Sequence, residues 1–174
     1  IEVASADASF RKYYRLRNKK ESVLLMDASL EKDSLSPFLN ITKRLSQSGI
    51  SVPKIFMQDI DKGFLIIEDF ANTHYLDILN IENYKVLYAK AINTILKMQK
   101  ADTKGLPLYD KKFLHVEMDL MSEWYLEKLL HVKLNEEQKE LIAATLNAVS
   151  DIVLEQPQDI FVHRDFHSRN IMLK

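Results

Sequence analysis

A polar run near the end of the sequence constrains the fold of this chain more than any other feature. It reads Val162-His163-Arg164-Asp165-Phe166-His167-Ser168-Arg169-Asn170, so His, Arg and Asp are followed by four residues and then Asn. The preceding residues 159–162 (Asp-Ile-Phe-Val) are mostly apolar and are predicted to form a short buried strand. A motif of fixed residue types gains weight from following such a strand.

An aspartate and an asparagine at this spacing are typical of a loop that transfers a phosphoryl group to an alcohol. Asp165 is expected to orient the acceptor hydroxyl and to accept its proton. The amide oxygen of Asn170 is expected to bind magnesium, which prefers oxygen ligands. His163 and His167 are expected to support the loop rather than to transfer a proton.

Two other interpretations of the run remain open. The run could be a strand end and a polar turn, with Asp165 capping the turn. Alternatively, His163, Asp165 and His167 could bind zinc in a hydrolase. The chain has no cysteine, and no second cluster at ligand spacing completes such a site. The other histidines are single and are predicted to be ordinary surface or core residues: His74, His115 and His131.

Composition is that of an ordinary soluble protein. With 174 residues, of which 47% are hydrophobic, the chain can form one domain or two small lobes. Its net charge of -1 gives no broad attraction to nucleic acid or to an anionic membrane. Without cysteine, a signal peptide or an apolar run long enough to span a bilayer, we expect a cytoplasmic protein. The first residue is Ile, which leaves the natural amino terminus open, and the sequence does not indicate the oligomeric state.

The chain changes in character near residue 70. Before it, β-rich segments alternate with turns, and one segment has apolar residues at helical spacing. Strands are predicted over residues 10–17, 22–27, 54–58 and 64–68, and a helix over residues 35–48 with Gly49 as its cap.

After residue 70, three helices are predicted. The first has a stripe formed by Ile81, Tyr84, Tyr88, Ala91, Ile92 and Ile95. The second covers residues 113–130 and carries Trp124. The third begins at a capping box of Asn135 and Gln138, continues through Leu141, Ile142, Leu146, Val149 and Val153, and ends before Pro157. These apolar stripes are predicted to be core.

This order predicts an α+β, two-lobed, protein-kinase-like fold whose C-terminal part is missing. Residues 1–69 would form an N-terminal nucleotide-binding lobe, a small antiparallel sheet with one helix. Residues 70–174 would begin a helical lobe that ends at the catalytic loop. The nucleotide would lie between the lobes, with its adenine on the backbone of a connector, residues 66–70. Glu68 and Phe70 are therefore candidate nucleotide contacts, although a strand end and polar turn explain them equally well.

The chain resembles the aminoglycoside phosphotransferase and choline kinase family, whose loop usually carries His at the second position after the catalytic Asp, as His167 does. Within this family it is most similar to bacterial anomeric kinases of N-acetylmuramate and N-acetylglucosamine in cell-wall recycling. The similarity lies in five stretches that together extend along nearly the whole chain: residues 7–16, 23–28, 63–69, 122–126 and 163–172.

The resemblance implies ATP as co-substrate, Mg²⁺ as cofactor and a small-molecule alcohol or sugar as acceptor. It also implies that residues 7–11 turn over the ATP phosphates, with Ser9, Phe10 and Arg11 as nucleotide contacts. None of the three glycines lies in this turn, so a glycine-rich phosphate loop is absent. An edge strand with outward charges is the alternative for residues 10–16.

Two departures from the family pattern stand out. Many members carry a lysine on the strand after the phosphate turn, where it pairs with the phosphates and with a helix glutamate. Residues 23–27 contain no lysine, and residues 35–48 contain no glutamate. Glu31 lies just before that helix. Candidate replacements for the lysine are Arg11, Lys12 and Arg15. Members also place a second metal-binding aspartate after the Asn, and the sequence ends at Lys174 before that position. We therefore expect a piece of a longer kinase that has little or no activity alone.

The expected reaction is phosphorylation of the anomeric hydroxyl of an amino sugar. Glu117, Asp119 and Glu123 could line an acceptor site or form an exposed acidic helix face. Choline or an aminoglycoside is the alternative acceptor. A catalytically silent nucleotide-binding or interaction module is the alternative from another class.

Overall fold

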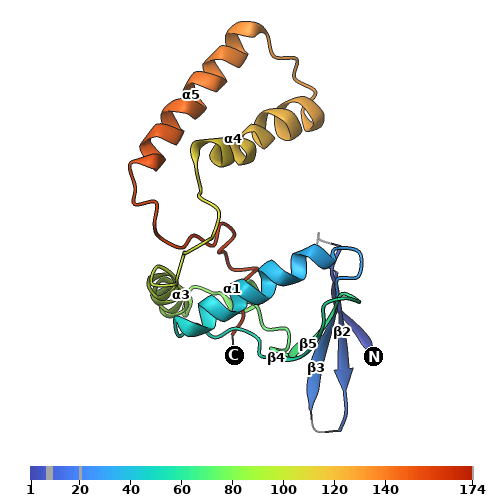
Figure 1. Ribbon diagram of the computed structural model, residues 1–174. Helices are drawn as coiled ribbons and strands as arrows, with labels where there is room; N and C mark the ends of the chain where they lie inside the picture. Colours follow the sequence, from blue (N-terminus) through green and yellow to red (C-terminus); the bar gives the residue numbers. More distant parts are fainter. Residues whose placement is uncertain (7–9, 20, 174) are drawn as a thin grey trace. The chain divides into compact units, whose positions relative to one another are not determined.

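The chain forms two compact units. The computed structural model describes residues 1–6, 10–19 and 21–173 (Figure 1). One unit, here called the sheet unit, contains Ile1–Asp102 and Phe161–Lys174, and the helical unit contains Thr103–Ile160. Residues 70–102 and the polar loop thus belong with the sheet. The predicted lobes, residues 1–69 and 70–174, stay a prediction.

A five-stranded antiparallel sheet in the order β1-β2-β3-β5-β4 forms the sheet unit's framework. Its strands are Glu2–Ala6, Lys12–Arg17, Ser22–Asp27, Ile55–Asp59 and Phe64–Glu68. The four predicted strands are confirmed. Strand β1 was not predicted, because its small residues give little β signal. It pairs antiparallel with β2.

Helix α1, Leu35–Gln47, completes the core over the sheet. Alternate residues of β5, Leu65 and Ile67, are buried, as the two-residue repeat of a strand requires. They join Met26, Ala28 and Leu35 in one core cluster. The predicted helix over residues 35–48 and its glycine cap are confirmed, since Gly49 has a φ of 74°.

Gly63 fixes the turn between β4 and β5. Its φ is 88°, and a Cβ at this position would lie 2.7 Å from the Cα of Ser29. The turn is this tight because the N–H of Ala28 donates to the Gly63 carbonyl at 2.8 Å. Only glycine satisfies both the backbone angle and the close approach.

Two helices follow the sheet: α2, Tyr75–Ile78, and α3, Tyr84–Met98. The predicted helix is confirmed from Tyr84 onward, but of its predicted buried stripe only Ala91 is buried, so for the other members the prediction is wrong. Leu87, Ala91 and Met98 are buried, whereas Ile81 and Ile92 are 84% and 56% exposed. Apolar residues occur on several sides of this helix, so their spacing could not identify the buried face.

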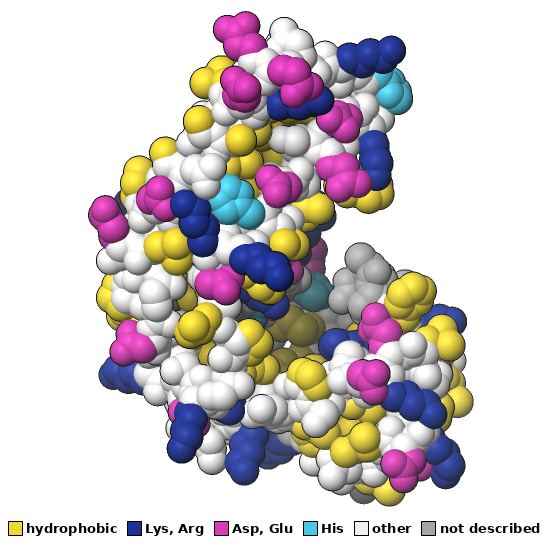
Figure 2. All heavy atoms as spheres, turned by 45° about the horizontal axis from the view of Figure 1, so that its top comes forward, with side chains coloured by type: hydrophobic (Ala, Val, Ile, Leu, Met, Phe, Trp, Pro, Cys, Tyr) yellow, Lys and Arg dark blue, Asp and Glu magenta, His cyan; other side chains and the backbone are white. Residues whose placement is uncertain are grey.

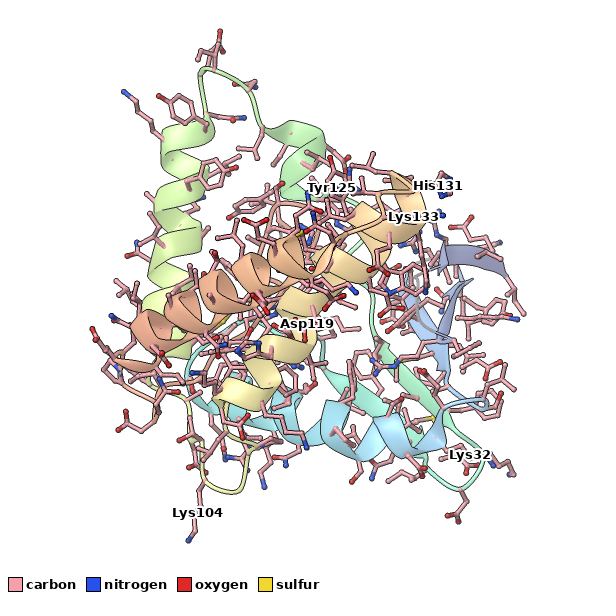
Figure 3. All side chains as sticks on the ribbon, turned by 90° about the horizontal axis from the view of Figure 1, so that it is seen from above. Lys32, Lys104, Asp119, Tyr125, His131 and Lys133 are labelled. Atoms are coloured by element: carbon pink, nitrogen blue, oxygen red, sulfur yellow. The ribbon has the colours of Figure 1, made fainter. Side chains whose placement is uncertain are left out.

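The helical unit consists of α4, Lys111–Leu120, a π-helix η2, Met121–Leu129, and α5, Glu136–Leu154. The predicted capping box is confirmed: Gln138 N–H donates to Asn135 Oδ1 at 2.9 Å, and Asn135 N–H donates to Gln138 Oε1 at 3.0 Å. At the ends of the unit, the Thr103 hydroxyl donates to the Asp159 carbonyl at 3.3 Å. Figure 3 labels Asp119 on α4, Tyr125 on η2, and His131 and Lys133 in the loop before α5.

Several apolar residues predicted to be core are exposed. Trp124 is 56% exposed and Leu141 67% exposed, so for these residues the prediction is wrong. Figure 2 shows hydrophobic side chains, in yellow, spread over the face in view. For Leu141, on α5, the reason is that α5 packs on α4, and a helix that packs on one neighbour buries only one of its faces. Among the described residues, no helix combines the length and the apolar character that crossing a membrane requires.

We expect Gly63→Ala to lower the free energy of unfolding by about 3 kcal/mol, from left-handed strain together with overpacking. Gly49→Ala is the matched control, because Gly49 also has a positive φ but nothing lies within 4 Å of its added Cβ. Its expected cost is about 1 kcal/mol. Urea denaturation of the native protein that carries this sequence measures both. Equal costs would show that the contact with Ser29 does not matter.

Candidate active site

The polar run is held by residues on its C-terminal side rather than by a strand before it. Residues 159–162 form no strand, so that prediction is wrong: Phe161 is buried, but Val162 is 51% exposed. A strand needs a neighbouring strand to pair with, and residues 159–162 have none. Strand-like pairing occurs only after the polar run. Met172 forms a β-bridge with His74, which lies just before α2.

Asp165, His167 and Asn170 form a hydrogen-bonded group, here called the loop cluster. The Asn170 Nδ2 donates to Asp165 Oδ2 at 2.6 Å and to the Asp165 carbonyl at 3.0 Å. The other carboxylate oxygen, Oδ1, lies 3.0 Å from His167 Nε2. Both oxygens of the carboxylate are therefore oriented by neighbours on the same loop.

The backbone fixes the tautomer of His167. The N–H of Arg169 donates to His167 Nδ1 at 3.2 Å, so in the neutral ring Nε2 carries the hydrogen. That hydrogen points at Asp165 Oδ1. This geometry fits the predicted role of His167 as loop support.

The loop cluster presents oxygen atoms to solvent. The Asp165 side chain is 70% exposed, so an acceptor hydroxyl can reach it. Because Asn170 turns its Nδ2 toward Asp165, its Oδ1 is the atom left for a cation. Carboxylate and amide oxygens fit magnesium, which usually keeps further ligands from water and phosphate. In the described part of the chain, no three His, Cys, Asp or Glu side chains are grouped to hold a metal, which gives the zinc alternative no support.

His163 lies apart from the loop cluster. Its ring packs edge-on against Phe166, with 5.6 Å between ring centroids. Desolvation lowers the pKa of His163, while the charge of Asp165 opposes this effect. Phe166 in turn packs against the core formed by Tyr75, Leu87 and Ala91. The predicted bracing role of His163 fits this contact.

Arg164 reverses the chain directly before Asp165. Its φ of 68° lies in the left-handed region, which costs a residue with a side chain about 1–2 kcal/mol. Such strain persists only where the surroundings hold it, and it often marks functional loops.

The predicted phosphate turn is described in part. Ser9 lies outside the described residues, and Phe10 is 67% exposed. Arg11 is half-buried, with Nε 3.3 Å from the Ser34 hydroxyl and 3.9 Å from Glu31 Oε2. Glu31, which precedes α1, thus brings an acid close to this turn.

Arg15, on β2, forms a buried ion pair with Asp69, the residue that follows β5. Its Nε and one terminal nitrogen contact the two carboxylate oxygens of Asp69 at 2.6 and 3.0 Å. The same nitrogen donates to the Ala71 carbonyl at 3.1 Å and to Asn72 Oδ1 at 2.6 Å. The Ser22 hydroxyl also donates to Asp69. Among the three candidates for the missing lysine, Arg15 is therefore already engaged.

The two charges of this pair shift one another's pKa. Burial by itself would raise the pKa of Asp69, but hydrogen bonds from Arg15, Ser22 and Ala71 outweigh it and hold the pKa below its ordinary value. The hydrogen bond to Asp69 raises the pKa of Arg15 despite burial. Both groups are charged throughout the neutral range.

The connector begins later than predicted. Residues 66–68 belong to β5, because they pair with β3 on one side and β4 on the other, so the chain leaves the sheet at Asp69. The backbone N–H of Glu68 donates to the Lys54 carbonyl at 2.8 Å, so this N–H already has a hydrogen-bond partner within the sheet. Phe70 is half-buried just after the strand. The nucleotide contacts of Glu68 and Phe70 stay predictions.

The sequence interpretation missed Asp69 and His74 as residues that support the site. The His74 Nδ1 lies 2.8 Å from the Arg169 carbonyl, 95 positions further along the chain. No local spacing signals a partner so distant.

The chain matches the phosphotransferase enzyme family over residues 1–174, and it belongs to this family. The N-acetylmuramate/N-acetylglucosamine kinases of Pseudomonas aeruginosa and Pseudomonas putida are 37% and 36% identical to it, over 98% and 99% of this chain. The kinase of that name from Neisseria meningitidis is 36% identical over 99%. The match covers 50%, 51% and 53% of these relatives, so the chain spans about half of their length.

A solved structure, the crystal structure of aminoglycoside-3'-phosphotransferase of type VIII, shares the fold with a TM-score of 0.58. The similarity covers 98% of this chain and 64% of that one, at 18% sequence identity. It confirms the predicted α+β, protein-kinase-like fold. The predicted family is confirmed as well.

We expect Asp69→Asn to lower the free energy of unfolding of the native protein by about 3 kcal/mol, because it removes the buried counterion of the Arg15 guanidinium and leaves only the half-exposed Glu2, 3.4 Å away. Lys62→Ala is the control, since it breaks an exposed, solvent-screened pair with Asp59 and should cost far less. Since the folded pKa of Asp69 is lowered, its contribution is present above the unfolded value near 3.8 and is lost as pH falls through the folded value. Denaturation at pH 7 and below pH 4 tests both statements; an Asp69→Asn cost as small as that of Lys62→Ala would contradict them.

Proposed function

We propose that the native protein that carries this sequence is an ATP-dependent kinase that phosphorylates the anomeric hydroxyl of an amino sugar, N-acetylmuramate or N-acetylglucosamine. The loop cluster carries the proposal, because it joins an exposed, oriented carboxylate to an amide oxygen within one loop. Relatives that are 36–37% identical and are named for these sugars support the choice of acceptor.

Asp165 acts as the base. It accepts a hydrogen bond from the anomeric hydroxyl and takes its proton as the sugar oxygen bonds to the γ-phosphorus of ATP. The bond between that phosphorus and the β–γ bridging oxygen breaks, and ADP leaves with the electron pair. The proton then passes from Asp165 to water. Hydrogen bonds from His167 and Asn170 keep the carboxylate aimed during these steps.

Asn170 is the proposed magnesium ligand, through Oδ1. Bound magnesium neutralises charge on the phosphate oxygens. The nucleotide contacts are Ser9, Phe10 and Arg11 in the predicted phosphate turn, and Glu68 and Phe70 beside the connector. The half-buried Arg11, with Glu31 nearby, is the cation best placed to take over from the lysine that β3 lacks.

The proposal extends to the setting of the reaction. Phosphorylation of these amino sugars would serve cell-wall recycling in the cytoplasm, without a nucleic-acid or membrane partner. Residues 1–69 and 70–174 would act as the two lobes around ATP.

To test the proposal, we would measure ATP consumption by the native protein with magnesium and N-acetylmuramate, N-acetylglucosamine, choline or kanamycin. Turnover is expected with an amino sugar, and Asp165→Ala should reduce it by about 10³-fold, the scale of a lost general base. Asp61→Ala, an exposed aspartate in the β4–β5 turn, is the control and should retain activity.

Other results would separate the alternatives. Turnover with choline or kanamycin but with neither amino sugar would contradict the proposed acceptor and favour the alternative kinases. ATP binding without turnover of any acceptor would favour a silent nucleotide-binding module, which the missing β3 lysine also suggests.

A further inference from the structure

A short segment far from the loop in sequence holds the loop in place. We call residues 73–76 the anchor segment. The N–H of Tyr75 donates to the Ile171 carbonyl at 2.9 Å, that of Leu76 donates to the Ser168 carbonyl at 3.1 Å, and that of Leu173 donates to the Thr73 carbonyl at 2.9 Å. The loop cluster therefore lies on a backbone that is fixed on both sides of Asn170.

His74 adds a side-chain hydrogen bond from the anchor segment to the loop. Its Nδ1 lies 2.8 Å from the Arg169 carbonyl. A carbonyl oxygen only accepts, so Nδ1 must carry the hydrogen. The carbonyl of Arg169 belongs to the peptide bond that enters Asn170. A bond to this carbonyl restricts rotation of that peptide plane and so the direction in which the Asn170 side chain leaves the backbone.

His74 is itself held firmly. Its N–H donates to Asp77 Oδ2 at 3.3 Å, and Asp77 returns a backbone hydrogen bond to the His74 carbonyl at 3.1 Å. The next residue, Tyr75, is 5% exposed and packs in the core with Phe166 and Ile171 from the loop. The imidazole thus extends from a backbone that is itself hydrogen-bonded to the loop and packed against it.

We infer that His74 is a positioning residue for the metal ligand: through the Arg169 carbonyl, it orients the Asn170 amide oxygen toward magnesium. The inference rests on one part of the proposed function, the assignment of Asn170 as a magnesium ligand. It does not depend on which acceptor is phosphorylated. His74 touches neither substrate nor metal. Outer residues that orient a metal ligand typically change metal affinity about 10- to 100-fold when they are removed.

Two substitutions separate this role from simple packing. His74→Phe keeps a ring of similar size but cannot donate a hydrogen bond. His74→Asn is smaller but keeps an N–H donor that can occupy the place of Nδ1. If His74 only filled space, the Phe variant would be the better replacement. His131→Ala is the control, since this histidine lies in the loop before α5.

The measurement is the dissociation constant of Mn²⁺ for the native protein with ADP, by electron paramagnetic resonance, together with kcat, KM and Tm. We expect His74→Phe to weaken Mn²⁺ binding about tenfold and to lower kcat, with the sugar KM and Tm little changed. His74→Asn should bind Mn²⁺ within about threefold of the unaltered protein. Equal binding by all variants, a Phe variant that binds better than the Asn variant, or no Mn²⁺ binding by the unaltered protein would each overturn the inference.

Failure of the proposed sugar kinase activity can be distinguished from failure of the His74 inference, because Mn²⁺ binding is measured without an acceptor. Weaker binding in His74→Phe alongside no turnover of any sugar would support His74 and contradict the proposed function. Sugar turnover with unchanged Mn²⁺ binding in His74→Phe would do the reverse. If His74→Phe fails to fold, His74→Ala takes its place as the variant without a donor: Mn²⁺ binding about tenfold weaker than that of His74→Asn, at an unchanged Tm, supports the inference, and equal binding by the two contradicts it.

Discussion

The buried ion pair between Arg15 and Asp69 sets the geometry on which the rest of the sheet unit depends. Their side chains are 3% and 5% exposed, so both charges lose most of their hydration. Such a loss is tolerated only where nearly every donor and acceptor has a partner, and here the further partners are Glu2, Ala71, Asn72 and Ser22. The pair joins β2 to the point where the chain leaves β5, and it holds Ala71 at a φ of 61°. The course of the connector is therefore fixed by electrostatics rather than by a helix or strand.

The residues that follow Asp69 connect this ion pair to the loop cluster. A few residues after Asp69, the anchor segment meets the polar loop through backbone hydrogen bonds and the Tyr75 core. The candidate nucleotide contacts at the connector and the candidate catalytic loop are thus supported by one continuous stretch. These contacts explain how a loop without a preceding strand can keep the side chains of Asp165 and Asn170 close together. They also explain how the left-handed backbone of Arg164 is maintained.

Features with local causes could be predicted from the sequence, and features with distant causes could not. The capping box of Asn135 and Gln138 and the cap at Gly49 act within a few residues, so their patterns predicted a helix start and a helix end. The loop motif singled out Asp165 and Asn170, which lie within hydrogen-bond distance of each other, and their roles stay predictions. The buried face of α3, the partner of Arg15 and the role of His74 depend on contacts between residues far apart in sequence. Spacing alone does not contain that information.

The hydrogen bond between Thr103 and Asp159 closes the helical unit at its base. The polypeptide therefore departs from the sheet unit and returns to it at neighbouring points, as in an inserted domain, and closing a longer or shorter excursion changes the chain entropy only slowly with length. In the described part of the chain, none of the anchors of the loop lies within residues 103–160. A change in the length of residues 103–160 would therefore leave the described hydrogen bonds of Asp165 and Asn170 in place, because these bonds form within the sheet unit.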